Sequence, residues 1–178
     1  CDLNKPNWGL PEEKYAVTKV QHLGVGKPVK LLNDATPKYS LNGAEVLVDG
    51  FLASTKFNDG YWVGLHGEDL DVVVDLGKTY SLRKISVNFL ENQESWIFLP
   101  DSVEFLLSED GNAFSTIKKF PLALEKKNHK SIHVFSEIFN GPGTRYVRIL
   151  AQNIGHCPQW HPGAGEKAWV FTDEVLID

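Results

Sequence analysis

Three segments of the chain combine aromatic rings with side chains that form hydrogen bonds. They hold Tyr61, Trp62 and His66 within residues 57–68, Asn92, Gln93, Glu94 and Trp96 within 91–98, and Gln159, Trp160 and His161 within 156–161. Proteins hold sugars by stacking C–H faces on aromatic rings while amide, carboxylate and imidazole groups bind the hydroxyls. These segments therefore predict a carbohydrate site.

Each tryptophan has an alternative role as a cover of the hydrophobic core. We favour the binding role for Trp62, Trp160 and His161, leave Trp96 open between the two roles, and assign Trp169 to the core. The full set of candidate ligand-binding residues is Trp62, His66, Asn92, Gln93, Trp96, Trp160 and His161.

A second kind of chemistry is suggested by the turn at Asp49-Gly50, which is followed by Ser54 and Thr55. Calcium takes several oxygen ligands, and a tight turn with a carboxylate and a hydroxyl supplies some of them. One more carboxylate would complete such a site. The alternative interpretation is an ordinary turn, because Asp-Gly followed by hydroxyl residues is a common turn sequence.

Catalytic machinery is not indicated by the sequence. There is no Gly-x-Ser-x-Gly, no His-Glu-x-x-His and no glycine-rich phosphate loop, and His156, Cys157 and His161 lack the spacing of a familiar zinc motif. We therefore expect a binding module and not an enzyme.

The segments with candidate residues are expected to connect β-strands. Apolar residues alternate with polar ones at 70–76, 84–89, 102–107, 132–134 and 147–151, and the run 168–177 is rich in aromatic and branched residues. Glycine-rich turns separate these runs, and only 122–127 could form a short helical turn. Many short strands separated by turns predict an all-β sandwich or barrel.

Composition limits the partners. The chain has 178 residues, 42% of them hydrophobic, with 18 basic and 23 acidic side chains and a net charge of −5. A chain of this length and composition can form the hydrophobic core of one domain. We expect a lead-in or linker at 1–14 and the module at 15–178. A chain with a negative net charge does not create the positive electrostatic potential that attracts nucleic acid. Its apolar runs are shorter than the roughly 20 residues that cross a bilayer. We expect neither nucleic-acid binding nor membrane insertion.

Cys1 and Cys157 are the two cysteines. They could pair, stay free or serve separate ends of the protein. Cys1 resembles the lipid-modified first residue of a mature bacterial lipoprotein, and it could equally be the chance start of a fragment.

Several of these segments, in this order, resemble the discoidin family, also called the coagulation factor 5/8 C-type domain. They are Val48-Asp49-Gly50, Ser54-Thr55, residues 69–77, Val103-Glu104-Phe105 leading into 108–111, residues 145–148 and Asp173-Glu174-Val175. The likeness runs from about Ala44 to the end of the chain. Within the family, the loop 153–165 with Lys167-Ala168-Trp169 is similar to family 32 carbohydrate-binding modules attached to bacterial family 20 β-N-acetylhexosaminidases.

The resemblance implies an antiparallel jelly-roll β-sandwich with a structural calcium ion. The implied ligands are side-chain oxygens of Asp49 and Glu174, the hydroxyl or carbonyl of Ser54, and the backbone carbonyls of Val46, Phe51 and Asp173. Galactose-binding relatives commonly have an arginine after the strand that ends near Leu90, where this chain reads Glu91-Asn92-Gln93. A preference for galactose is therefore not carried over.

Together these observations predict a calcium-stabilised, non-catalytic carbohydrate-binding module. We expect a monomeric part of a larger bacterial protein that is secreted, periplasmic or at the cell surface. It would hold an attached glycoside hydrolase, such as a β-N-acetylhexosaminidase, or a surface complex on glycans containing N-acetylhexosamine or galactose. The alternative is an adhesion module that contacts protein or a membrane surface through Trp96-Ile97-Phe98-Leu99.

Overall fold

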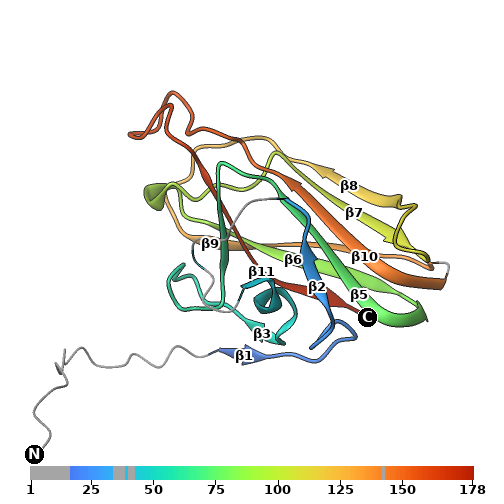
Figure 1. The fold of residues 1–178 in the computed structure, drawn as a ribbon. Coiled ribbons are helices and arrows are strands. Elements are labelled where there is room, and N and C mark those ends of the chain that lie inside the picture. The colour runs from blue at the N-terminus through green and yellow to red at the C-terminus, as the bar shows by residue number, and fades with distance from the viewer. Residues whose placement is uncertain (1–16, 34–38, 40–42, 142) are drawn as a thin grey trace, which may run out of the picture.

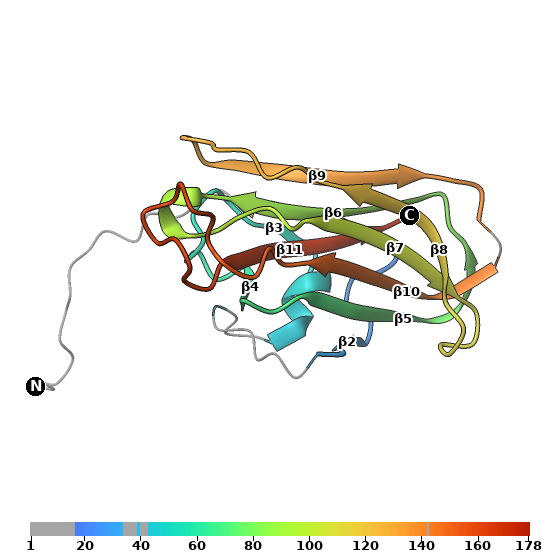
Figure 2. The same cartoon turned by 90° about the horizontal axis from the view of Figure 1, so that it is seen from above.

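The computed structural model describes residues 17–33, 39, 43–141 and 143–178, and shows two antiparallel sheets packed face to face (Figure 1) (Figure 2). One sheet has the strand order β2-β5-β10-β7-β8, the other has the order β4-β11-β6-β9, and β1 pairs with β3. The strands are β1 (Thr18–Lys19), β2 (Val29–Leu31), β3 (Phe51–Leu52), β4 (Val63–His66), β5 (Leu70–Ser81), β6 (Lys84–Glu91), β7 (Ser102–Ser108), β8 (Ser115–Pro121), β9 (Ser131–Ile138), β10 (Gly143–Gln152) and β11 (Trp169–Ile177). The predicted all-β sandwich is confirmed.

The main core lies between the two sheets and follows the period-two pattern of the strands. In β5, Leu70, Val72, Val74 and Leu76 are fully buried, and the residues between them are partly exposed. Strands β6, β7 and β10 add buried branched and aromatic residues from the facing sides, so the two inner faces close over one cluster. This rigid frame leaves the connecting loops at the ends of the sandwich to carry variation.

A second apolar cluster covers the outer side of the four-stranded sheet. Trp62 is fully buried there against Leu90 and Phe171, and its indole N–H donates a hydrogen bond of 2.9 Å to the carbonyl of Ser54. The segment around β3 therefore packs on the sheet as a lid, and Trp62 is its central side chain.

Three details differ from the sequence expectation. Ser86 and Asn88, expected on an open face of β6, are buried, and β6 lies between β11 and β9 in its sheet. In β9 the core-facing residue is Phe135, whereas Val134 is 62% exposed. Residues 122–127 form no helical turn; the two 3₁₀ helices are η1 (Gly43–Val48) and η2 (Gln93–Ser95).

Some sequence predictions concern residues outside the described part. The proposed lead-in at 1–14, which includes Cys1, lies outside the described residues. Cys157 is buried and makes no disulfide with a described residue, and burial raises the pKa of its thiol. No helix in the described part of the chain is long and apolar enough to cross a membrane.

The burial of Trp62 predicts a stability effect. Trp62→Ala should lower the free energy of unfolding by about 3–5 kcal/mol, because it leaves a cavity beneath the lid and removes an indole hydrogen bond. Urea denaturation followed by far-ultraviolet circular dichroism measures this loss. The matched change Trp160→Ala, at a residue that is 39% exposed, should cost about 0.5 kcal/mol or less. Equal losses for the two variants would contradict the assignment.

Candidate ligand-binding site

Three loops meet at one end of the sandwich. The β6–β7 connection with η2 and the β10–β11 connection lie together at this end in both views (Figure 1) (Figure 2), and the β8–β9 connection joins them through hydrogen bonds described below. Between the loops is an open recess of about 370 Å³. Its lining residues are Gln93, Glu94, Trp96, Lys126, Lys127, Asn128, Trp160, His161 and Pro162.

Two indoles flank the recess. Trp96 is 36% exposed and Trp160 is 39% exposed, which is unusual for the largest apolar side chain. The His161 ring lies near both, with centroid distances of 6.3 Å to Trp96 and 6.1 Å to Trp160. The recess thus offers two aromatic surfaces around one imidazole.

Trp96 is held in a backbone conformation that favours glycine. Its φ of 65° places it in the left-handed region at the C-terminal end of η2, and it is the one non-glycine residue with positive φ in the described part. A Cβ atom at Gly163 would lie 2.8 Å from Cε2 of Trp96, so the indole packs directly on that glycine. Residues with a strained backbone concentrate at functional sites. A tryptophan kept in a conformation that costs conformational free energy therefore indicates a function for its ring.

Gln93 ties the first loop to the second. Its side chain is buried, and its Nε2 donates to the carbonyl of Glu125 at 2.7 Å and to the carboxylate of Glu91 at 2.9 Å. Its Oε1 accepts from the backbone N–H of Lys127 at 2.9 Å. The Gln93 amide therefore fixes the backbone on both sides of Lys126.

His161 ties the first loop to the third. Its Nδ1 accepts from the backbone N–H of Gly163 at 3.0 Å, so the ring proton is on Nε2, which donates to the carbonyl of Gln93 at 2.7 Å. Both residues that fasten the loops, Gln93 and His161, are buried. We call this pair the loop junction.

The structure brings four of the seven sequence candidates together and leaves three elsewhere. Gln93, Trp96, Trp160 and His161 line the recess, whereas Trp62 lies in the second apolar cluster. His66 stacks on Trp169 at a ring distance of 4.2 Å, and buried Asn92 donates to the hydroxyl of Ser95. Trp169 is 8% exposed, as expected of a core residue.

Lys126 lines the recess and was missed as a candidate. Its Nζ lies 5.9 Å from the Trp160 ring centroid. The available signal is the basic sequence Lys126-Lys127-Asn128-His129-Lys130, whose first two residues fall within the possible helical turn at 122–127. No pattern in the sequence connects that segment to Trp160.

The predicted apolar spike at residues 96–99 is wrong. Ile97 and Phe98 are buried, with exposures of 1% and 0%. Phe98 packs against the His161 ring at 5.2 Å, beneath the recess. The segment therefore does not present a row of apolar side chains to a membrane, because it supports the aromatic floor of the recess.

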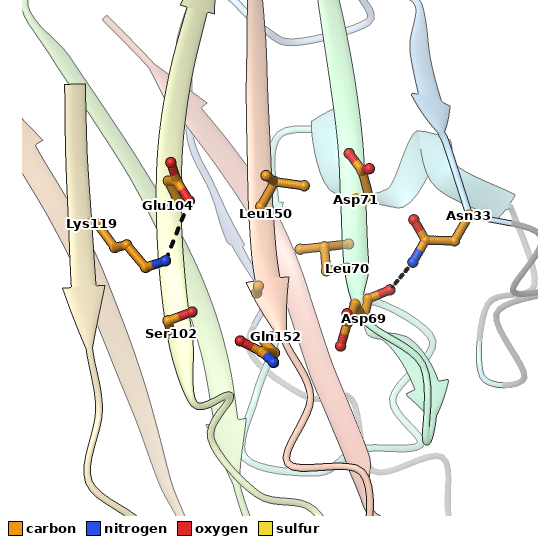
Figure 3. A pocket seen from close by; sticks show the side chains of 10 residues that line it. Asn33, Asp69, Leu70, Asp71, Ser102, Glu104, Lys119, Leu150 and Gln152 are labelled. Atoms are coloured by element: carbon orange, nitrogen blue, oxygen red, sulfur yellow. Dashed lines mark hydrogen bonds and ion pairs between the residues drawn. The ribbon is translucent and has the colours of Figure 1, made fainter. Parts of the chain in front are cut away.

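A second recess lies on the outer face of the five-stranded sheet, between Asp71, Leu150 and Glu104 (Figure 3). Its charged groups already have partners: Asp71 forms a two-bond pair with Arg148, and Glu104 contacts Lys119 and Thr116. Its lining contains no aromatic ring. These satisfied pairs and the lack of a stacking surface favour the recess at the loop end as the ligand site.

The three acidic residues predicted to hold calcium, Asp49, Asp173 and Glu174, lie together in an acidic cluster, with Asp173 and Glu174 fully buried and Asp49 partly buried. Glu174 is fully buried, and its Oε1 is 2.6 Å from His22 Nε2 and accepts from the N–H of Gly50 at 3.0 Å. His22 Nδ1 accepts from backbone N–H groups of Gly24 and Ile177, so the ring proton is on Nε2 and points at Glu174.

Two carboxylate oxygens of this cluster, Asp173 Oδ1 and Glu174 Oε2, are buried without a hydrogen-bond donor from any described residue. Burial raises the pKa of Asp173 to about 7. Burial, opposed by the N–H of Phe51 and assisted by the nearby Glu174 charge, raises the pKa of Asp49 to about 6. Buried carboxyls with unmet oxygens form an environment that a cation would stabilise.

Other features of the cluster limit how well it fits a calcium ion. Ser54 is engaged elsewhere, because its hydroxyl donates to Asp59 at 2.7 Å and its carbonyl accepts from Trp62. Within the described ranges, no group of three or more His, Cys, Asp or Glu side chains is arranged to hold a metal ion. A cation here would therefore depend on Asp49, Glu174 and backbone carbonyls such as those of Val46 and Phe51.

Comparison with known proteins gives likeness at the level of the fold. No protein-family model and no curated protein sequence matches the chain. A fucose-binding module of Streptococcus pneumoniae has a TM-score of 0.58 at 14% identity, over 89% of this chain and 94% of the module. Chitosan-binding module 1 of a Paenibacillus sp. IK-5 chitosanase/glucanase has a TM-score of 0.56 at 15% identity, over 89% and 98%.

A Clostridium perfringens module, solved in complex with GalNAc-β-1,3-galactose, has a TM-score of 0.52 at 16% identity, over 84% of this chain and 94% of that module. The fold is therefore that of carbohydrate-binding β-sandwich modules. At these identities the likeness concerns architecture, so the ligand has to be inferred from the residues of this chain.

The loop junction predicts a local stability effect. His161→Ala should lower the free energy of unfolding by about 1–3 kcal/mol, because it removes the acceptor of the Gly163 N–H and one of the two donors to the buried Gln93 carbonyl, the other being the N–H of Trp96. Hydrogen–deuterium exchange should show faster exchange at Gly163 and in residues 91–98. The control His156→Ala, at an exposed histidine of the same loop, should leave both measurements unchanged. Unaltered exchange at Gly163 in His161→Ala would show that the junction does not hold the loops.

Proposed function

We propose that this domain is a non-catalytic glycan-binding module whose ligand lies in the recess between Trp96 and Trp160. The observation that carries this proposal is the pair of exposed indoles, one of them in a strained conformation. A sugar ring places its C–H face on such a surface and loses little hydration. The fold shared with fucose-, chitosan- and GalNAc-galactose-binding modules supports the same class of ligand.

Polar groups at the rim supply the hydrogen bonds that a sugar requires. Glu94 and Asn128 are exposed and line the recess together with Lys126. A carboxylate accepts from hydroxyls, an ammonium donates to them, and an amide does both. The hydroxyls of a hexose stacked on Trp160 would find donors and acceptors on two loops.

The affinity of one such site is expected to be modest, because a monosaccharide buries little area. We propose that the module belongs to a larger extracytoplasmic protein, such as a glycoside hydrolase acting on N-acetylhexosamine- or galactose-containing glycans. Attachment to that protein would supply avidity. A β-N-acetylhexosaminidase is the parent that the loop 153–169 suggests.

Binding is tested directly by titration calorimetry with L-fucose, chitosan oligosaccharides and GalNAc-β-1,3-galactose. Trp160→Ala should weaken the best ligand about tenfold, because a lost stacking surface is worth roughly 1.4 kcal/mol. Trp96→Gly should weaken it similarly, and the relief of the positive φ should offset part of the packing lost with the indole.

The control for this experiment is Phe114→Ala, which removes a ring on the outer face of the five-stranded sheet and should leave the isotherm unchanged. If both tryptophan variants bind as the unaltered protein does, the recess is not the glycan site.

We further propose that calcium binds at the acidic cluster and stabilises the turn at Asp49 against β11. Bound to Asp49 and Glu174, the ion would offset the charge of buried carboxylates and join segments 124 positions or more apart. The partnerless Glu174 Oε2 supports this proposal.

Calcium at about 100 times its dissociation constant should raise the melting temperature by roughly 5–10 °C. Differential scanning calorimetry in calcium chloride and in EDTA measures the shift. In Glu174→Gln the response to calcium should vanish, whereas magnesium chloride serves as the ionic-strength control. Identical melting of the unaltered protein in calcium and in EDTA would remove the proposal.

A further inference from the structure

The β8–β9 connection brings a basic segment to the rim of the recess. Residues 126–130 contain three lysines and a histidine, although the chain as a whole has a net charge of −5. Lys126, Asn128, His129 and Lys130 are exposed. The acidic side chains near them are Glu94, which lines the same recess, Glu125, and the buried Glu91, whose charge acts on Lys127.

The lysines of this segment are not equivalent. Lys127 is bound to the Glu125 carboxylate, which raises the pKa of its ammonium group. Lys126 makes no ion pair with a described carboxylate, and its Nζ lies over the Trp160 ring instead. An ammonium on an aromatic face is weakly held at an exposed site and remains available to a stronger partner.

The position of Lys126 is set by the loop junction. Gln93 binds the carbonyl of Glu125 and the N–H of Lys127, so the backbone is fixed immediately before and after Lys126. Gln93 is in turn joined to His161, the neighbour of Trp160. The same set of hydrogen bonds therefore fixes the backbone beside Lys126 and beside Trp160, which brings the ammonium group close to the indole ring.

We infer that the preferred glycans carry an anionic group, either a carboxylate or a sulfate ester, next to the ring that stacks on Trp160. This inference rests on the proposed glycan-binding function and names its ligand class. The anionic group would leave water to meet the Lys126 ammonium, which donates up to three charge-assisted hydrogen bonds. Glu94, which lines the same recess, would accept hydrogen bonds from hydroxyl groups and would disfavour a second negative charge on the ligand.

The experiment compares sugars that differ only in the anionic group. Galactose is compared with galacturonic acid, and N-acetylglucosamine with its 6-sulfate, by titration calorimetry at 50 mM and 500 mM sodium chloride. At low salt the anionic member should bind about fivefold more tightly, since a partly exposed ion pair contributes roughly 1 kcal/mol. The preference should shrink at high salt because the charges are screened.

Variants assign the preference to one side chain. Lys126→Gln should remove the difference between the two members of each pair and should weaken the anionic member more than the neutral one. Lys130→Gln removes an equal charge from the same segment, at a residue outside the recess lining, and should keep the preference. A preference for only the carboxylate or only the sulfate identifies which group the site takes.

The outcomes separate the inference from the proposed function. Equal affinities within each pair for the unaltered protein would overturn the anionic preference and leave glycan binding intact. A preference that survives Lys126→Gln would overturn the role of Lys126. If no sugar in either pair binds, and the panel of neutral glycans fails as well, the proposed function fails and the inference fails with it.

Discussion

The loop junction is the interaction on which the site depends. Gln93 uses its amide to fix the second loop. His161 uses Nε2 to join the third loop to the first, while its Nδ1 accepts from Gly163 within the third loop. Because both side chains are buried, these hydrogen bonds are exchanged for water only when the loops open. Every surface group of the recess, including both indoles and Lys126, is attached to one of the three loops that this junction joins. Without it, Trp96, Trp160 and Lys126 would lie on three independent loops.

The sandwich provides the frame against which the junction works. The backbone N–H of Trp169 donates to the carbonyl of Trp96, and the carbonyl of Trp169 accepts from the N–H of Phe98, so the strained turn that ends at Trp96 is fastened to the end of the four-stranded sheet. Phe98 fills the space below the His161 ring. The cost of a positive φ at Trp96 is therefore met by packing and strand pairing, which is how local strain persists at binding sites. The acidic cluster around Glu174 lies on another part of the frame and bears on stability, not on the ligand.

The strands were predictable from the sequence and the roles of individual loop residues were not. Alternation identified β5, β7 and β10 because one face of each strand meets the core. It gave the wrong burial for Ser86 and Val134, because the pattern within one strand does not show which segments cover its outer face or whether it lies at a sheet edge. Trp62 and Trp160 stand in similar loop sequences, yet one is a core residue and the other is exposed, a difference that depends on which loop folds over the sheet. Gln93 and His161 were identified as ligand residues by their chemistry, whereas their side chains hold the loops. Lys126 gave no signal because its relation to Trp160 exists only through the fold.

The most direct test of a glycan site between Trp96 and Trp160 is nuclear magnetic resonance of the indole N–H groups during a glycan titration of the ¹⁵N-labelled protein. The account predicts that the signals of Trp96 and Trp160 shift in a saturable way, while the signal of buried Trp62 stays in place. Saturable shifts confined to amides of the outer sheet face, with both exposed indoles unmoved, would contradict it.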